Sequence, residues 1–211
     1  MKKFIIALFI LTLSLSVFSQ EKIKVACVGD SITYGYGIAN PADRYPNQLA
    51  NMLGQNYLIG NFGVSGATLL SDGTYPYIKL KAYFAALEFK PNIVIIKLGT
   101  NDTKNENWEK ILDFEGDLNK LVASFENLDT KPTIYLCTSC PIFGSGVNLG
   151  DKRVSRLIPV IKKVAKEHSL KIIDIRSIFE GKPELVPDRV HPNEAGAKLI
   201  AEAVKNAILA E

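Results

Sequence analysis

The chain has 211 residues, of which 47% are hydrophobic and 22% are charged, and its formal net charge is +3. This length supplies a substantial hydrophobic core and suits a single domain once the N-terminal segment described next is removed. So small a charge argues against nucleic acid or an anionic membrane surface as the main partner.

Residues 1–19 have the pattern of a secretory signal peptide. Lys2 and Lys3 form a basic start, residues 4–18 form a short apolar core, and Ser19 precedes the expected cleavage site. The apolar run is too short and wrongly flanked for a membrane span, although an uncleaved N-terminal anchor has a similar pattern. We expect cleavage to leave a domain of residues 20–211 with a net charge near +1, exported to the periplasm or fully secreted.

Apolar, β-branched runs alternate with helix-like stretches along the rest of the chain. The predicted strands are residues 23–28, 57–62, 93–98, 133–137 and 171–175, and the predicted helices are residues 42–53, 76–89, 106–128, 151–168 and 192–209. Most strand runs are continuously hydrophobic, which is typical of parallel strands covered on both faces. Strands that alternate with helices imply right-handed crossovers. We therefore predict an α/β fold, with one doubly wound, flavodoxin-like domain around a five-stranded parallel sheet.

Two residues stand out within these predicted elements. Lys97 interrupts the third apolar run, and it either reaches an edge of the sheet or forms a buried ion pair. Pro192 suits the first turn of the last helix, where its missing N–H costs no hydrogen bond.

Polar motifs follow the first three predicted strands and precede the last helix. In chain order they are Gly29-Asp30-Ser31-Ile32-Thr33, Asn61-Phe62-Gly63-Val64-Ser65-Gly66, Gly99-Thr100-Asn101-Asp102 and Asp188-Arg189-Val190-His191-Pro192. Each motif alone is compatible with an ordinary turn or helix cap. Because sites in open parallel sheets form at the carboxyl ends of the strands, all four motifs can converge on one edge. Together they supply a serine, a base, a carboxylate and amide donors, which are the groups that acyl transfer requires.

These four blocks, in this order and strand context, resemble the SGNH hydrolase superfamily, also called GDSL esterases. The chain lacks the G-x-S-x-G elbow of ordinary α/β-hydrolases. The resemblance implies a serine esterase with Ser31 as nucleophile, His191 as general base and Asp188 as the carboxylate that orients the base. It also implies an oxyanion hole formed by the backbone N–H groups of Ser31 and Gly63 and the side-chain amide of Asn101.

The substrate is indicated less directly. The segment 98–108 is most similar to the branch that contains carbohydrate and sialate O-acetylesterases, which implies small acyl esters, acetyl above all, on glycans or other small molecules. Tyr34, Tyr36 and Trp108 either stack on sugar rings or pack against the core. A lysophospholipase or thioesterase of the same superfamily is an alternative that needs an apolar groove. A non-catalytic carbohydrate-binding module is an alternative of another class, disfavoured because all five expected groups are present.

The other histidine and the cysteines receive no catalytic role. His168 ends a predicted lysine-rich helix, where a histidine suits the helix dipole. Cys27 lies in a predicted strand, as a small buried hydrophobe does. Cys137 and Cys140 are either a disulfide or two free thiols, and a redox role is disfavoured because Pro141 follows in place of a helix. Two histidines and one cysteine pair are too few for zinc, so we expect no metal and no other cofactor; the oligomeric state is left open.

Overall fold

A computed structural model describes residues 21–144 and 148–210, so the predicted signal peptide lies outside the described residues. Five parallel strands form one sheet in the order β2-β1-β3-β4-β5. Their bounds are β1 Ile23–Gly29, β2 Tyr57–Gly63, β3 Ile93–Lys97, β4 Thr133–Cys137 and β5 Lys171–Ile173. The strand order reverses next to β1, which is the doubly wound arrangement that the alternating pattern predicts.

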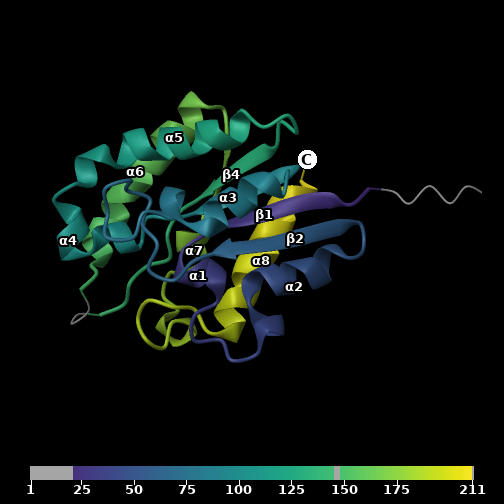
Figure 1. Cartoon of the computed structure of the whole chain (residues 1–211). Helices are drawn as coiled ribbons and strands as arrows, with labels where there is room; N and C mark the ends of the chain where they lie inside the picture. Colours follow the sequence, from purple (N-terminus) through teal and green to yellow (C-terminus); the bar gives the residue numbers. More distant parts are fainter. Residues whose placement is uncertain (1–20, 145–147, 211) are drawn as a thin grey trace, which may run out of the picture.

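Helices cover both faces of this sheet (Figure 1). One face is covered by α3 Lys81–Glu88, α5 Phe114–Glu126 and α6 Asp151–Glu167, and the other by α2 Tyr45–Leu53, α7 Ile175–Phe179 and α8 Glu194–Leu209. Within the described ranges, none of the helices combines the length and apolar character needed to cross a bilayer.

The alternation of side chains along each strand divides the core into two clusters. In β1, Ala26 and Val28 join the cluster beneath α5, whereas Val25 and Cys27 join the cluster beneath α8. All four side chains are fully buried. Burial on both faces explains why the strands are continuously apolar instead of alternating.

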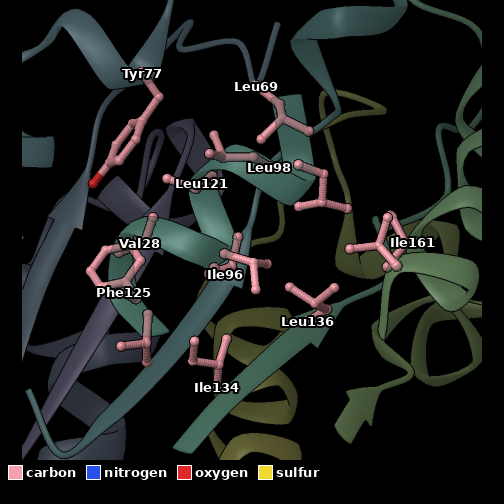
Figure 2. Packing of buried hydrophobic residues seen from close by; sticks show 14 of the residues in the cluster. Val28, Leu69, Tyr77, Ile96, Leu98, Leu121, Phe125, Ile134, Leu136 and Ile161 are labelled. Atoms are coloured by element: carbon pink, nitrogen blue, oxygen red, sulfur yellow. The ribbon is translucent and has the colours of Figure 1, made fainter. Parts of the chain in front are cut away.

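Figure 2 shows the first of these clusters, in which neighbouring strands meet one helix. Val28 of β1, Ile96 of β3 and Leu136 of β4 pack beneath Leu121 and Phe125 of α5. The register pairs Val28 with Ile96 and Ile96 with Leu136, so the three side chains form one row across the sheet. The carboxyl ends of these packed strands form the edge of the sheet that carries the site described below.

The segment predicted as one helix at 106–128 is divided. It consists of α4 Asn105–Trp108, a 3₁₀ turn at Ile111–Asp113 and α5. Lys110 lies at the break with φ −98° and ψ 8°, and its ammonium group donates to the backbone oxygen of Asp72 at 2.6 Å. This contact with a loop distant in sequence accompanies the interruption, which helical periodicity alone does not reveal.

Several predicted boundaries also move by a few residues. The predicted helices at 42–53 and 76–89 begin later, at Tyr45 and Lys81, because 3₁₀ turns containing or following a proline precede both. Pro192 lies before α8 and not in its first turn, because Asn193 is the N-cap and its Oδ1 accepts from the Gly196 N–H at 3.0 Å. The last strand ends at Ile173, since Asp174 caps the short helix α7.

Lys97 forms a buried ion pair and does not reach an edge of the sheet. Its ammonium nitrogen lies 3.7 Å from Asp30 Oδ1, and the two side chains are 1% and 0% exposed. Burial acts to lower the pKa of Lys97, but the Asp30 carboxylate outweighs it and holds the pKa above its usual value. The charged pair therefore lies directly behind the turn that carries Ser31.

The three cysteines are buried free thiols. Burial raises the pKa of Cys137 to about 12 and that of Cys140 to about 11. Neither thiol has the thiolate character that disulfide exchange requires. This environment gives no support to a redox role.

Candidate active site

Ser31, His191 and Asp188 form one hydrogen-bonded chain at the carboxyl edge of the sheet. Ser31 begins the short helix α1 Ser31–Tyr34, directly after β1, and His191 and Asp188 lie in the loop before α8. Ser31 Oγ lies 2.8 Å from His191 Nε2, and His191 Nδ1 lies 2.6 Å from Asp188 Oδ2. The structure thus brings together two segments that are 160 residues apart in sequence.

The direction of this chain follows from the chemistry of its members. An ionised carboxylate only accepts hydrogen bonds, so His191 Nδ1 carries the proton and Nε2 accepts from the Ser31 hydroxyl. Asp188 Oδ1 also accepts from the backbone N–H groups of His191 at 2.6 Å and Val190 at 3.0 Å. Partial burial acts to raise the pKa of Asp188, but these hydrogen bonds outweigh it and hold the pKa below its usual value. Asp188 is therefore a fixed anion at the Nδ1 edge of the imidazole.

A cavity of about 230 Å³, which we call the serine cavity, lies at the Ser31–His191 end of these hydrogen bonds. Ser31 and His191 form part of its wall. The other residues of the wall are Tyr36, Ser65, Gly66, Asn101, Lys104, Leu149 and Val190. Its volume lies below the range of roughly 300–1,000 Å³ that is typical of ligand pockets. The space at the serine is accordingly suited to a small group.

Asn101 reaches the serine cavity from the turn after β3. Its side chain is 5% exposed, and one N–H of its amide donates to the Ala67 backbone oxygen at 3.1 Å. An amide carries two N–H donors, so this bond fixes the side chain and leaves a second donor for a ligand.

Gly63 does not line the serine cavity, which is contrary to its predicted place in the oxyanion hole. Its N–H donates to Asn61 Oδ1 at 3.0 Å. A Cβ at this position would overlap the backbone of Thr33 and Tyr34, so glycine is needed here to let β2 pack against α1. The structure gives no support to the predicted role, because this glycine serves the contact between two elements and its N–H already has an acceptor.

Gly66, three residues later, takes the place at the cavity that was expected for Gly63. It lines the serine cavity and has φ +83°, a left-handed conformation that side chains disfavour. Within residues 21–144 and 148–210, its N–H has no hydrogen-bond acceptor. The signal in the sequence was the Ser65-Gly66 dipeptide, a turn signal that follows the strand.

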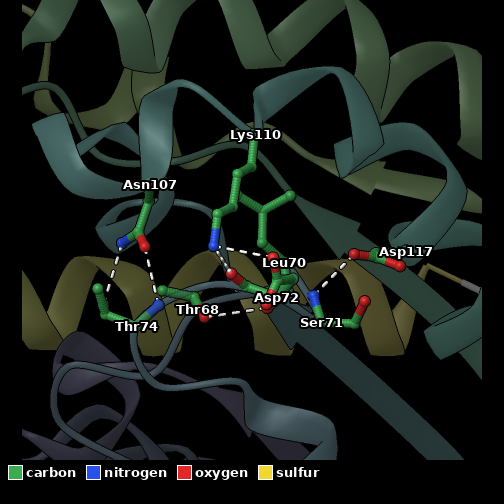
Figure 3. Close-up of polar contacts among 8 residues, drawn as sticks. All are labelled: Thr68, Leu70, Ser71, Asp72, Thr74, Asn107, Lys110 and Asp117. Carbon is green, nitrogen blue, oxygen red and sulfur yellow. Dashed lines mark hydrogen bonds and ion pairs between the residues drawn. The ribbon is translucent and has the colours of Figure 1, made fainter.

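Side chains from two helices and a turn hold the loop that follows Gly66. Asp102 is fully buried and accepts from the backbone N–H groups of Leu69 at 3.1 Å and Leu70 at 2.8 Å. Figure 3 shows two further contacts, from Asp117 Oδ2 to the Ser71 N–H at 2.7 Å and from Asn107 Oδ1 to the Thr74 N–H at 2.8 Å. This loop is therefore fixed in place before any ligand arrives.

Only one of the three aromatic residues predicted to bind substrate lines the serine cavity. Tyr36 is 52% exposed, and its ring centroid lies 4.5 Å from that of His191. Tyr34 lies beneath the Arg44 guanidinium at 4.8 Å and outside the cavity wall. The Trp108 ring packs against the core cluster and lies within about 5 Å of the guanidinium groups of two arginines of α6, so it is not free to stack on a sugar.

The remaining titratable candidates lie elsewhere. His168 contacts Glu126 and Asn119 of α5, at 3.0 Å and 2.9 Å, and takes no part in the site. In the parts of the chain that the structure describes, no group of three or more His, Cys, Asp or Glu side chains is arranged to hold a metal ion.

The chain belongs to the GDSL-like lipase/acylhydrolase family, whose model matches residues 27–199. It is 40% identical over 209 residues to an acetylxylan esterase of Xylanibacter ruminicola, covering 90% of this chain and 44% of that protein. The chain thus spans less than half the length of this curated relative. The family resemblance drawn from the four sequence blocks is confirmed.

Solved structures share the fold at low sequence identity. The native aryl esterase of M. smegmatis matches with a TM-score of 0.72 and 22% identity, over 89% of this chain and 98% of that one. A carbohydrate acetylesterase from Sinorhizobium meliloti matches with a TM-score of 0.72 and 20% identity, over 90% and 99%. The predicted single domain with a five-stranded parallel sheet is confirmed.

Proposed function

We propose that this protein is a serine esterase that releases small acyl groups, acetyl in particular, from carbohydrates. The observation that carries the proposal is the hydrogen-bonded chain of Ser31, His191 and Asp188 in the wall of a small cavity. A nucleophile, a base in hydrogen-bond reach and a third group that orients the base are the parts that acyl transfer requires.

In the proposed reaction, Ser31 Oγ attacks the ester carbonyl while His191 Nε2 takes the hydroxyl proton. The imidazolium that forms lies against Asp188, whose charge stabilises it. His191 then returns the proton to the leaving alcohol, and an acyl-serine remains. Water attacks this ester in a second cycle, in which His191 again acts first as base and then as acid, and the carboxylic acid leaves.

Three donors are proposed to hold the oxyanion. The first is the backbone N–H of Ser31, which is at the first position of α1 and has no partner within that helix. The second is the remaining N–H of the Asn101 amide. The third is the N–H of Gly66, in place of Gly63, whose N–H is bonded to Asn61. Donors that are fixed before the reaction stabilise the developing charge without reorganisation.

Three observations support a small acyl group on a sugar. The serine cavity of about 230 Å³ is short of the space that a long acyl chain needs. The relative from Xylanibacter ruminicola, an acetylxylan esterase, supports acetyl esters of a polysaccharide as substrates. The exposed ring of Tyr36 beside His191 offers a surface on which a sugar can stack.

The test is a chain-length series of p-nitrophenyl esters, from acetate to palmitate, with the wild type, Ser31→Ala and Ser177→Ala. Ser177 is an exposed serine of α7 and serves as the matched control. We expect a preference for acetate that Ser31→Ala lowers at least about 10⁴-fold in kcat, while Ser177→Ala leaves it unchanged. A preference for long chains assigns the protein to lipid or thioester substrates. Failure of a fluorophosphonate probe to label Ser31 in active, folded protein contradicts the serine mechanism.

A further inference from the structure

A second hollow adjoins the serine cavity. It has a volume of about 240 Å³ and is lined by Asn105, Asn148, Leu149, Gly150 and Arg153, and we call it the arginine hollow. Leu149 belongs to the walls of both, and Lys104 of the serine cavity is followed directly by Asn105 of the arginine hollow. Each space alone is smaller than a typical ligand pocket, whereas the two joined fall within the range of roughly 300–1,000 Å³. A ligand held at Ser31 thus has room for a second unit beside it.

Polar side chains line the arginine hollow and hold one another in place. The Arg153 guanidinium Nη1 donates to the Thr103 backbone oxygen at 2.9 Å and to Asn105 Oδ1 at 2.8 Å. Its plane lies over the Trp108 ring, 5.1 Å from the centroid. Asn148 Oδ1 accepts from the Asn105 N–H at 3.3 Å. The guanidinium is therefore fixed in orientation while it keeps further N–H donors for a ligand.

The charge of the joined space is positive. Lys104 and Arg153 are the charged residues in its walls that the structure describes, apart from His191 when protonated. Neither forms a salt bridge within the described ranges. Glu106 is an acid beside the hollow that belongs to neither wall: its carboxylate accepts from Asn148 at 2.9 Å and also interacts with the charge of Lys104. Two cations in a sugar-sized space therefore face one acid outside its walls, and Arg153 has no carboxylate partner among the described residues, which favours an anionic ligand.

We propose that the arginine hollow binds the sugar next to the acetylated one and selects a sugar that carries a carboxylate. Arg153 and Lys104 bind the carboxylate, and the amides of Asn105 and Asn148 are placed for ring hydroxyls. The substrate class is then an acetylated acidic glycan, in which a uronate neighbours the ester. This inference rests on the proposed esterase function and adds the chemistry of the leaving group to it.

The test compares two acetylated oligosaccharides that differ in one group, a glucuronate and its carboxyl-reduced counterpart. We expect the wild type to prefer the carboxylated substrate by about fivefold in kcat/KM, mainly through KM. Arg153→Gln and Lys104→Gln each reduce this preference, whereas Arg153→Lys retains most of it because the charge remains. Lys152→Gln, at an exposed lysine next to Arg153, is the matched control and keeps the full preference.

The outcomes separate this inference from the proposed function. Equal kcat/KM values for the two oligosaccharides with an active wild type overturn the arginine hollow as a carboxylate site and leave the esterase standing. A preference that persists in both glutamine variants also overturns it. A wild type that hydrolyses neither oligosaccharide nor p-nitrophenyl acetate contradicts the proposed esterase itself. At 1 M ionic strength the screening length is about 3 Å, and we expect the preference to shrink there.

Discussion

Two carboxylates at the same edge of the sheet have opposite environments. Asp188 is half exposed and faces the imidazole of His191, and its pKa is held below the usual value. Asp102 is fully buried and faces two backbone N–H groups of the loop after Gly66. Burial raises the pKa of Asp102 to about 6, against the opposing effect of these hydrogen bonds.

The difference shows that a carboxylate at the same edge of the sheet as Ser31 need not take part in the proposed ester hydrolysis. Asp188 keeps its charge and has an acid-base partner, so it can stabilise a second charge that forms beside it. Among the described residues Asp102 forms no salt bridge, and it holds in place the loop that follows Gly66, a residue of the serine cavity wall. In the proposed reaction Asp188 acts on the reacting groups through His191, whereas Asp102 supports the loop.

The largest expected effect is that of Asp188→Asn. An amide at this position permits the wrong imidazole tautomer, and in a serine protease the equivalent change lowers kcat by about 10⁴-fold. We expect a loss of similar size in kcat for p-nitrophenyl acetate, and also a loss of stability at pH 7, because the lowered pKa of Asp188 means that its charged form stabilises the folded state. Asp102→Asn, assayed alongside, should change the free energy of unfolding and leave kcat near the wild-type value. A near wild-type kcat for Asp188→Asn would contradict the proposal that Asp188 orients His191.

Asn101→Ala should have the next largest effect. It distinguishes the role of Asn101 from that of its neighbour Asp102 in the same turn. Asn101 faces the serine cavity and Asp102 faces the loop, so loss of the amide removes one proposed oxyanion donor. Removal of such a donor costs about 10²- to 10³-fold in kcat. Steady-state kinetics should show this loss in kcat and not in KM. A change confined to KM would instead mark Asn101 as a binding residue of the ground state.

The pH dependence of stability tests Asp102 directly. Because its pKa in the folded state lies above the ordinary value, the folded state takes up a proton more readily than the unfolded state between about pH 4 and pH 6. Stability from this group therefore rises as the pH falls through about 6, by up to about 3 kcal/mol for a shift of this size.

Asp102→Asn is neutral at every pH and should lack this contribution. Urea unfolding of both proteins at several values between pH 4 and pH 7.5 gives the comparison. Asp188 acts with the opposite sign and in a lower window. Its stabilisation is complete above the ordinary pKa of an aspartate, near 4, and is lost as the pH falls through the depressed folded pKa. Parallel pH curves for wild type and Asp102→Asn would disprove the assigned environment of Asp102.

The sequence predicts the elements and the convergence of Ser31, His191 and Asp188 better than it predicts the details around them. Continuous apolar strands and ordered motifs were sufficient for the strand number, the fold class and the convergence of Ser31 with His191. The structure favours a different glycine from the predicted one, because the availability of a backbone N–H depends on local pairing. Gly63 pairs with Asn61, whereas Gly66 lies in a turn without such a partner.

Contacts between distant segments account for the other differences. Trp108 was a reasonable sugar-binding candidate by its position after Asn101. Arg153 and Arg156 lie against its ring, and no residue near Trp108 in the sequence indicates these contacts. The break before α5 has a similar origin, since Lys110 contacts Asp72 of the loop after Gly66. The local sequence pattern therefore predicts structure that depends on neighbouring residues. It does not predict features, such as the surroundings of Trp108, that depend on contacts between distant segments.

The smallest expected effect concerns a third carboxylate, Asp117, which holds the same loop from α5. Burial acts to raise its pKa, but the Ser71 N–H and Lys120 outweigh it and lower the pKa below the usual value. Lys120 lies 3.0 Å from Asp117 Oδ1, and its side chain is 72% exposed. Such an exposed partner contributes roughly 0.2–1 kcal/mol, so Lys120→Ala should lower the free energy of unfolding by no more than this.

The bond from Asp117 Oδ2 to the Ser71 N–H does not depend on Lys120, so kcat should stay within about twofold of wild type. Urea unfolding at low and at high salt measures the effect, which should fade at high salt because the charge of Lys120 is screened. A loss well above 1 kcal/mol that persists at high salt would mean that Lys120 stabilises the loop through packing of its stem and not through its charge. The loop would then depend on packing against α5 in addition to its buried hydrogen bonds, and Asp102 would be only one of several groups that hold it.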